Sequence, residues 1–255
     1  MEAQGDISGK KTFLLYPHSV IKDEVLDELI MNGYETYPLR DHERARRLLE
    51  RFPGSIMFIN IDERLSEAEW EVYIRELQGN PKTRESQLGI LSYNNDQGLM
   101  QKYLIEMALP CGYIQLKLGV KESTKIILDA LQAIEAKGRR KFIRAFCDDD
   151  AQATMNYKDP EGETFYGKLL DISSAGFAAK IGNFSQFPPN SLLRNVQLKL
   201  HGSLIMANAV LMGNRRDDKD IYILLFDPKM LQDHKVVLHH YIKQSLQRYI
   251  EQLKV

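Results

Sequence analysis

The sequence predicts two domains of different class. The first is an α/β domain with a doubly wound parallel sheet, and the second is a six-stranded antiparallel β-barrel with a C-terminal helix. Over residues 1–136, apolar strand patterns alternate five times with helical patterns, which is typical of a parallel sheet covered by helices on both faces. A basic linker follows at 137–150, and residues 151–255 change to short strands, frequent turns and one last helical pattern. The 255 residues are enough for two domains of ordinary size.

Composition excludes several classes of protein. The net charge of −1 argues against a general nucleic-acid or anionic-membrane binder, because such proteins carry a broad basic surface. Cys111 and Cys147 form no CxxC pair, so neither a disulfide framework nor a structural zinc site is expected, and a reducing cytoplasm fits best. The polar stretch Met1–Lys11 does not read as a signal peptide. No apolar run approaches the roughly 20 residues that span a bilayer, so no membrane insertion is expected.

The first domain is expected to contain five strands and five helices. The expected strands are Thr12–Tyr16, Tyr34–Leu39, Ser55–Ile59, Leu88–Leu91 and Cys111–Leu118. The expected helices are Val20–Asn32, Asp41–Phe52, Ser66–Gln78, Gln97–Leu109 and Lys121–Lys137. The first and last of these helices place apolar residues on one face, as helices that cover a sheet do. Asn32-Gly33 supplies a stop signal, and Asp41 is expected to be an N-cap.

This order of strands and helices resembles the response-regulator receiver domain. The fold places functional residues at the carboxyl ends of its strands. The resemblance implies an acidic pair after the first strand to hold magnesium, but Tyr16 and Pro17 stand there. It also implies a phosphoacceptor aspartate at the end of the third strand, where this chain has Asn60, with Asp62 two residues on.

The residues missing from the receiver pattern are those that perform phosphotransfer. Ser92 matches the hydroxyl after the fourth strand, and Lys117 matches the lysine of the fifth. A hard cation needs carboxylate oxygens at about 2.0–2.1 Å, and an asparagine amide is a poor phosphoryl nucleophile. We therefore expect a receiver-like domain that no longer takes a phosphoryl group. An ordinary α/β scaffold, and a displaced phosphoacceptor at Asp62, are the alternatives.

The second domain is expected to be all-β until its last helix. The expected strands are Ala151–Tyr157, Thr164–Leu170, Gly176–Ile181, Asn195–Leu200, Leu204–Met212 and Asp220–Phe226. His201-Gly202-Ser203 predicts a tight hairpin. Six short strands in about 80 residues are typical of an antiparallel barrel. Part of the apolar face of the final helical pattern, Lys229–Lys254, is expected to lie on the barrel and part to meet a partner.

Two motifs stand at the start of the second domain. The first is a basic stretch with Lys137, Arg139, Arg140, Lys141 and Arg144 within eight positions, and the second is Asp171-Ile172-Ser173-Ser174-Ala175-Gly176, a polar turn between apolar runs. Each motif alone has an ordinary explanation. A basic run commonly complements a helix dipole in solvent, and DxSxxG can be a simple Asx turn.

Together and in this order, the motifs resemble those of the PilZ domain, the bacterial receptor module for cyclic di-GMP. Arg140–Arg144 satisfies RxxxR, preceded by the extra Arg139 that is common in the family, and Asp171–Gly176 satisfies (D/N)xSxxG. The resemblance covers about residues 138–228. It implies cyclic di-GMP as a ligand, with no cofactor, no metal and no catalytic residues.

The resemblance implies six ligand-binding residues. They are Arg139, Arg140, Arg144, Asp171, Ser173 and Gly176. Guanidinium groups pair with phosphate oxygens and with guanine O6 and N7, and they stack on purine faces. A carboxylate at Asp171 would accept from the N1–H and N2–H₂ edge of guanine, and Ser173 would bond a base edge or a phosphate. Gly176 is expected to permit a turn with positive φ.

The expected function is a non-enzymatic cyclic di-GMP receptor. Its ligand would draw the basic linker onto the barrel and reset the angle between the domains, acting on a downstream partner. The family commonly regulates motility, biofilm formation or virulence. An enzyme is disfavoured because the chain lacks a strand-end acid pair, a metal-spaced His/Asp cluster and a GxSxG elbow. The alternative is a ligand-free interaction adaptor that uses the receiver-like domain and the final helix. One ligand molecule and an intercalated pair both fit the motifs.

Overall fold

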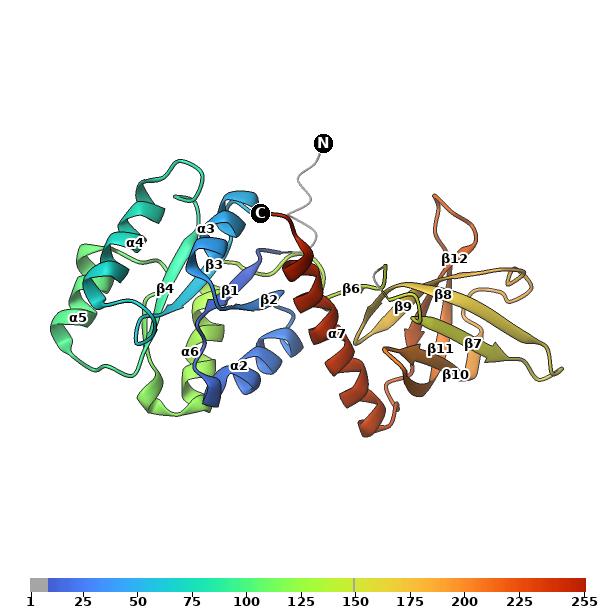
Figure 1. Ribbon diagram of the computed structural model, residues 1–255. Coiled ribbons are helices and arrows are strands. Elements are labelled where there is room, and N and C mark those ends of the chain that lie inside the picture. The colour runs from blue at the N-terminus through green and yellow to red at the C-terminus, as the bar shows by residue number, and fades with distance from the viewer. Residues whose placement is uncertain (1–8, 149) are drawn as a thin grey trace. The chain divides into compact units, whose positions relative to one another are not determined.

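The computed structural model describes residues 9–148 and 150–255. The chain divides into two compact units (Figure 1). The N-terminal unit comprises the chain up to Lys141 together with Ile250–Val255, and the barrel unit comprises Phe142–Tyr249. The boundary therefore falls inside the segment 137–150 that the sequence assigns to a linker, and the last residues of the chain belong to the N-terminal unit. The expectation for Met1–Lys11 lies mostly outside the described residues.

The N-terminal unit is built on a five-stranded parallel sheet with the order β2-β1-β3-β4-β5. Its strands are β1 (Thr12–Leu15), β2 (Thr36–Leu39), β3 (Ile56–Asn60), β4 (Gln87–Ser92) and β5 (Tyr113–Gln115). The predicted doubly wound α/β domain is confirmed. Because the strand order reverses between β1 and β3, the carboxyl ends of these two strands form the topological switch point at which such folds place their functional residues.

In the part of this unit that the structure describes, five α-helices surround the sheet (Figure 1). They are α2 (Ser19–Met31), α3 (His42–Arg51), α4 (Glu67–Gly79), α5 (Gln97–Gln101) and α6 (Val120–Ala133). Asp41 caps α3 as predicted, its carboxylate accepting from the Arg44 amide at 2.9 Å. Ser66 begins α4 with a capping box that includes Glu69. The expected contribution of Val20 and Ile21 to the apolar face of α2 lies outside the described side chains.

Several predicted elements of this unit are shorter than expected, including the helix Lys121–Lys137, which ends at Ala133. The predicted helix Gln97–Leu109 is α5 followed by a π-helical turn, η1 (Lys102–Glu106), and the helix ends before Pro110, which disfavours helical backbone at the residue before it. The predicted strand Cys111–Leu118 is only β5, because Leu116–Leu118 form a 3₁₀ turn, η2. Gly119, with φ of 89°, ends that turn and begins α6.

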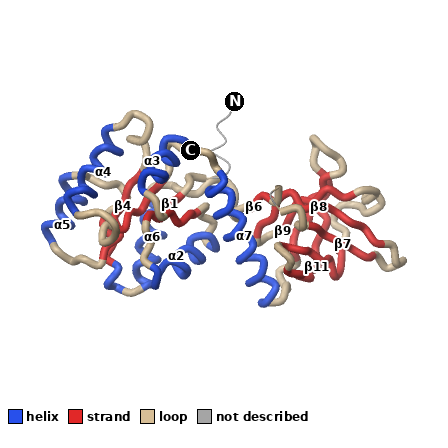
Figure 2. Tube along the Cα trace, viewed as in Figure 1, coloured by secondary structure: helices blue, strands red, loops and turns tan. Residues whose placement is uncertain are grey.

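The barrel unit is an antiparallel sheet closed on itself (Figure 2). Its strands are β6 (Ala145–Phe146), β7 (Thr154–Lys158), β8 (Thr164–Ser173), β9 (Gly176–Ile181), β10 (Leu192–Leu200), β11 (Ser203–Asn214) and β12 (Ile221–Phe226). The order is β6-β8-β7-β10-β11-β12-β9, and an additional β8–β9 pairing closes six strands into a barrel. The predicted six-stranded antiparallel barrel is confirmed, and β6 is a short strand outside it that the sequence did not predict.

Local sequence explains the ends of two strands. His201 and Gly202 both have positive φ, 45° and 84°, so they form the tight turn predicted between β10 and β11. The predicted strand Ala151–Tyr157 begins only at Thr154, because the preceding residues form a turn around Asp150. The Asp150 carboxylate is buried and accepts from the amides of Gln152 and His201. The end of the predicted linker is therefore a turn organised by the buried Asp150 carboxylate.

The final helix, α7 (Gln232–Gln252), contributes to both units. Within the barrel unit, Leu238, Ile242 and Leu246 are buried, and the Tyr241 ring lies 4.4 Å from the His201 ring. Within the N-terminal unit, the Arg44 guanidinium donates to the carbonyls of Ile250, Glu251 and Leu253 at 2.7, 3.0 and 3.0 Å. These bonds satisfy carbonyls at a helix end that have no partner inside the helix. Among the described residues, no helix is long and apolar enough to cross a membrane.

Candidate ligand-binding site

The DxSxxG motif forms the end of one strand and the start of the next. Asp171, Ile172 and Ser173 belong to β8, and Gly176 opens β9 directly opposite Ser173. The turn itself is therefore shorter than the sequence indicated. The Ser173 hydroxyl is buried, donates to the Gly176 carbonyl at 3.1 Å and accepts from the Ala175 amide at 3.3 Å. In this structure Ser173 closes its own hairpin, and its contact with a ligand stays a prediction.

The predicted reason for Gly176 is wrong. Gly176 is not among the described glycines with positive φ. A Cβ at this position would lie 2.2 Å from the Leu224 carbonyl oxygen and 2.9 Å from the Leu225 Cα. Glycine is required here because the backbone of β9 lies too close to β12 for any side chain.

Strand β6 joins the two motifs. Ala145 pairs with Ile172 and Phe146 pairs with Asp171. This register leaves the Arg144 Nη1 3.4 Å from the Asp171 Oδ1. The Arg144 side chain is 41% exposed and that of Asp171 is 13% exposed. The second arginine of RxxxR and the first residue of DxSxxG are thus an ion pair on the surface of the barrel unit.

The other two predicted arginines belong to the N-terminal unit. Arg139 and Arg140 precede the boundary between Lys141 and Phe142. The chain just before them is held there, because the Lys10 amide donates to the Ala136 carbonyl at 2.8 Å. The convergence of Arg139 and Arg140 on Asp171 therefore stays a prediction.

Sequence reasoning missed a further cation near Asp171. Arg215, in the turn between β11 and β12, forms an ion pair with Asp217 at 2.8 Å. The pKa of Arg215 is raised mainly by its hydrogen bond to Asp217, with a smaller electrostatic effect of Asp171. No sequence signal marks Arg215, because it lies far from both motifs along the chain and only barrel closure brings it near.

The residues that the sequence analysis compared with a receiver domain include Asn60, Asp62 and Ser92, near the carboxyl edge of the parallel sheet. The Asn60 amide donates to the Tyr16 carbonyl at 2.8 Å, and the Asn60 side-chain oxygen accepts from the Asp62 amide at 3.2 Å. The Asp62 carboxylate accepts from the Ser92 hydroxyl and from the Tyr93 amide, both at 2.6 Å. The Ser92 hydroxyl, which matches the receiver pattern, is thus already hydrogen-bonded to Asp62.

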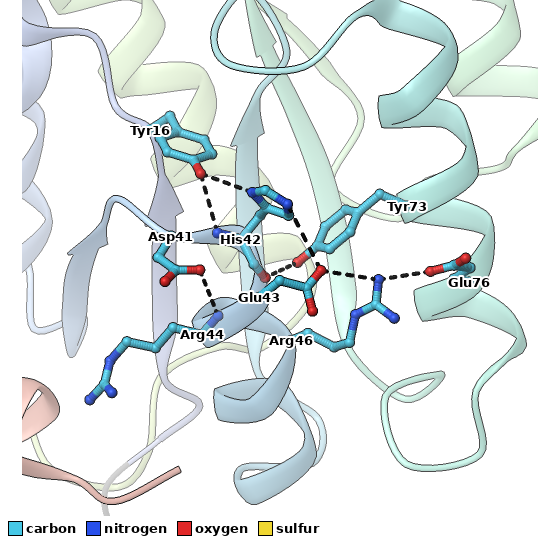
Figure 3. A network of polar contacts seen from close by, with 8 residues as sticks. All are labelled: Tyr16, Asp41, His42, Glu43, Arg44, Arg46, Tyr73 and Glu76. Carbon is cyan, nitrogen blue, oxygen red and sulfur yellow. Dashed lines mark hydrogen bonds and ion pairs between the residues drawn. The ribbon is translucent and has the colours of Figure 1, made fainter.

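Aromatic side chains fill the place after β1 where a receiver carries its acidic pair. Figure 3 shows the Tyr16 hydroxyl against His42, at 2.9 Å from its Nδ1, and the Tyr73 hydroxyl donating to the His42 carbonyl at 2.7 Å. The buried Trp70 ring packs 6.0 Å from the Tyr16 ring. Burial raises the pKa of both tyrosines, so their hydroxyl groups stay protonated near neutral pH.

The predicted placement of Lys117 in a fifth strand is wrong, and its match to the receiver lysine stays a prediction. Lys117 lies in η2, and its ammonium group is 3.3 Å from the Asn95 side-chain oxygen. Within the described part of the chain, no group of three or more His, Cys, Asp or Glu side chains could hold a metal ion.

We expect acetyl phosphate and Mg²⁺ to leave Asp62 unmodified, because its carboxylate already accepts from the Ser92 hydroxyl and the Tyr93 amide. Intact mass spectrometry measures this directly, and stoichiometric phosphorylation at Asp62 would contradict it.

Asp62→Ala should destabilise the N-terminal unit by about 1–3 kcal/mol, since the Ser92 hydroxyl then loses the carboxylate to which it donates in the core. Asp129→Ala, on the exposed side of α6, is the matched control and should leave thermal unfolding unchanged.

Several solved structures are similar to part of this chain. No family model and no curated protein matches the chain. The PilZ domain of YcgR from Escherichia coli, solved with c-di-GMP, is similar over 44% of this chain and 93% of its own, at 16% identity and a TM-score of 0.36. The MrkH–c-di-GMP complex of K. pneumonia matches over 44% of this chain and 52% of its own, at 22% identity and a TM-score of 0.33.

A third similar structure is the inhibitor of motility MotI/DgrA of Bacillus subtilis. It matches over 45% of this chain and 53% of its own, at 18% identity and a TM-score of 0.35. The chain thus covers about half the length of MrkH and of MotI/DgrA. At these values the functional inference depends on the motifs and their geometry in this chain.

Proposed function

We propose that this chain is a non-enzymatic, cytoplasmic receptor for cyclic di-GMP. The observation that supports the proposal is the β6–β8 pairing, which sets Arg144 3.4 Å from Asp171 and so joins the two motifs on one exposed surface. Arg139, Arg140 and Arg144 would bind phosphates and purines. Asp171 would accept from the guanine edge, while Ser173 and Gly176 shape the hairpin beside it.

The Arg144–Asp171 ion pair is suited to exchange its partners for a ligand. Arg144 is the exposed member of the pair, at 41%, whereas Asp171 is 13% exposed, so Asp171 needs new donors when the two side chains separate. A phosphate offers Arg144 a bidentate partner, and the N1–H and N2–H₂ groups of guanine offer Asp171 two donors. Each new charged hydrogen bond is worth about 1.5–3 kcal/mol, so the exchange favours the ligand complex.

Calorimetric titration with cyclic di-GMP tests the proposal. We expect saturable binding, and a micromolar Kd would correspond to about −8.2 kcal/mol. Cyclic di-AMP is the matched control, because it keeps both phosphates but its adenine lacks the O6 acceptor and the N1–H donor that guanine presents. The proposal is overturned if cyclic di-GMP shows no binding at about 1 mM, the concentration that corresponds to −4.1 kcal/mol.

The position of the arginines along the chain supports a regulatory role. Arg140 and Arg144 are four residues apart, and the boundary between the two units falls between them. A ligand that holds both arginines restricts the backbone that connects the units, and so changes the range of their relative orientations. Small-angle scattering with and without saturating ligand measures this, and identical profiles would count against it. The output would be a downstream partner in motility, biofilm formation or virulence.

A second candidate is a ligand-free interaction adaptor that uses the receiver-like domain and the final helix. The observation that favours it is the exposure of apolar side chains near the start of α7, where Leu231 is 66% and Val236 58% exposed. The same titration separates the two candidates. An adaptor gives no heat with cyclic di-GMP at any concentration that saturates a receptor.

A further inference from the structure

Phe146 is a large apolar side chain that the fold turns toward solvent. Its neighbours Ala145 and Cys147 are each 1% exposed, whereas Phe146 is 62% exposed. This alternation is that of an extended strand with one buried face, so the outward direction of Phe146 is set by the backbone. Its ring has no aromatic contact within the described part of the chain, while Phe165, Phe177 and Phe184 pack in ring pairs. Single exposed apolar residues are common, so exposure alone does not indicate a function for Phe146. Its position relative to the candidate ligand site is the stronger evidence.

That placement is directly beside the residues of the ligand site. Phe146 is the cross-strand partner of Asp171, and directly opposed residues on antiparallel strands project from the same face with Cβ atoms about 4.5–5.5 Å apart. Arg144 lies two residues earlier on the same side of the chain and reaches Asp171. One exposed surface therefore presents an aromatic face, a carboxylate and a guanidinium.

The residues that continue this row have small side chains nearest to Asp171. On its other side Asp171 pairs with Ala178 of β9, and Ala178 pairs in turn with Ile223 of β12. Gly176, two residues before Ala178, has no side chain at all. The β9 neighbour of Asp171 in this row therefore carries only a methyl side chain, at a position that is 4% exposed.

We propose that Phe146 is the stacking platform for one guanine of the ligand, and that Asp171 binds the edge of that same base. This inference rests on the proposed function and adds to it a ligand contact that the two motifs do not contain. The aromatic ring supplies a π-face, which every purine can use. Asp171 supplies the acceptor that selects guanine over adenine. Alanine substitution of an aromatic residue that stacks on a base weakens the binding of the nucleotide about 5- to 150-fold.

The test is cyclic di-GMP titration of the full chain carrying Phe146→Ala, Phe146→Leu or Phe146→Trp. We expect alanine to weaken binding about 5- to 150-fold. Leucine should also weaken binding, because it keeps an apolar surface but has no π-face. Tryptophan should preserve binding, because its ring offers a π-face. Tyr166→Ala is the matched control, because Tyr166 is a 71% exposed aromatic on β8 that pairs with Asn156 away from the motif. It should leave the affinity unchanged.

The outcomes separate this inference from the receptor proposal. If the wild type binds, Arg144→Ala loses affinity and Phe146→Ala matches the wild type, the stacking platform is overturned and the receptor stands. If Phe146→Leu binds as tightly as the wild type, the contact is apolar and the stacking role is likewise overturned. If the wild type does not bind cyclic di-GMP, the receptor proposal fails and the platform fails with it. Thermal unfolding without ligand should be unchanged in all three variants, because the side chain is exposed.

Discussion

Replacing Arg144 with alanine should weaken cyclic di-GMP binding at least about tenfold, because each charged hydrogen bond to the ligand is worth about 1.5–3 kcal/mol. The Asp171 carboxylate then also loses its ion pair with Arg144, whose Nη1 lies 3.4 Å from the Asp171 Oδ1 in the free protein. Arg140→Ala should have an effect of the same size, and the double variant should bind more weakly than either. Calorimetry on the three variants and the wild type measures all of these affinities in one series.

Two further substitutions show which property of Arg144 matters. Arg144→Lys keeps the positive charge but loses the planar fork that pairs with two phosphate oxygens, so it should retain only part of the affinity. Arg194→Ala, at an exposed position on β10, removes the same type of side chain outside the motifs and should have no effect. If Arg144→Ala and Arg140→Ala both bind as tightly as the wild type, the ligand site is refuted, whatever the wild-type affinity is.

The long elements of this chain could be predicted because their patterns repeat over many residues. The predicted strand Gly176–Ile181 has those bounds in the structure, and the apolar spacing in the final helical pattern gives α7. Strand β6 could not be predicted in this way. It has two residues, too few for a period, and Ala145, Phe146 and Cys147 are all apolar, so the sequence does not mark which of them faces solvent.

The candidate site could be predicted only as far as its motifs extend along the chain. RxxxR and DxSxxG identify Arg144 and Asp171, and these two residues form an ion pair. Arg215 and Phe146 lie outside both motifs. Arg215 comes near Asp171 through closure of the barrel, and Phe146 faces Asp171 through the register of β6. Both depend on long-range pairing, which local patterns do not encode.

Gly176 is an instructive case because the residue was identified and its physical role was not. A glycine after a polar turn is commonly explained by positive φ. Here the cause is the nearness of the Leu224 carbonyl, on a strand that the local sequence does not reveal as a neighbour. The properties of Cys147, which follows β6, also depend on the fold. Burial raises the pKa of its thiol to about 11, so the thiol stays protonated at neutral pH.

Gly176→Ala should be among the most destabilising single substitutions in the barrel unit. Its Cβ would lie 2.2 Å from the Leu224 carbonyl oxygen, and this neighbour is backbone that cannot rotate away. Overpacking of this kind costs about 1–3 kcal/mol or more, and each kcal/mol lowers the Tm of a domain of 60–100 residues by about 4–8 °C. Thermal unfolding followed by near-ultraviolet circular dichroism measures the loss. Cyclic di-GMP binding should weaken as well, because Ser173 and Gly176 close the hairpin next to Asp171.

The controls for this prediction distinguish a steric cause from a conformational one. Gly182→Ala, at a position with no atom within 4 Å of the added Cβ and no positive φ, should change stability by no more than about 1 kcal/mol. Asparagine tolerates positive φ far better than alanine does. If φ were the reason for Gly176, Gly176→Asn would be milder than Gly176→Ala. Because the obstacle is the backbone of β12, we expect the larger asparagine to be at least as destabilising, and the reverse order would restore the conformational explanation.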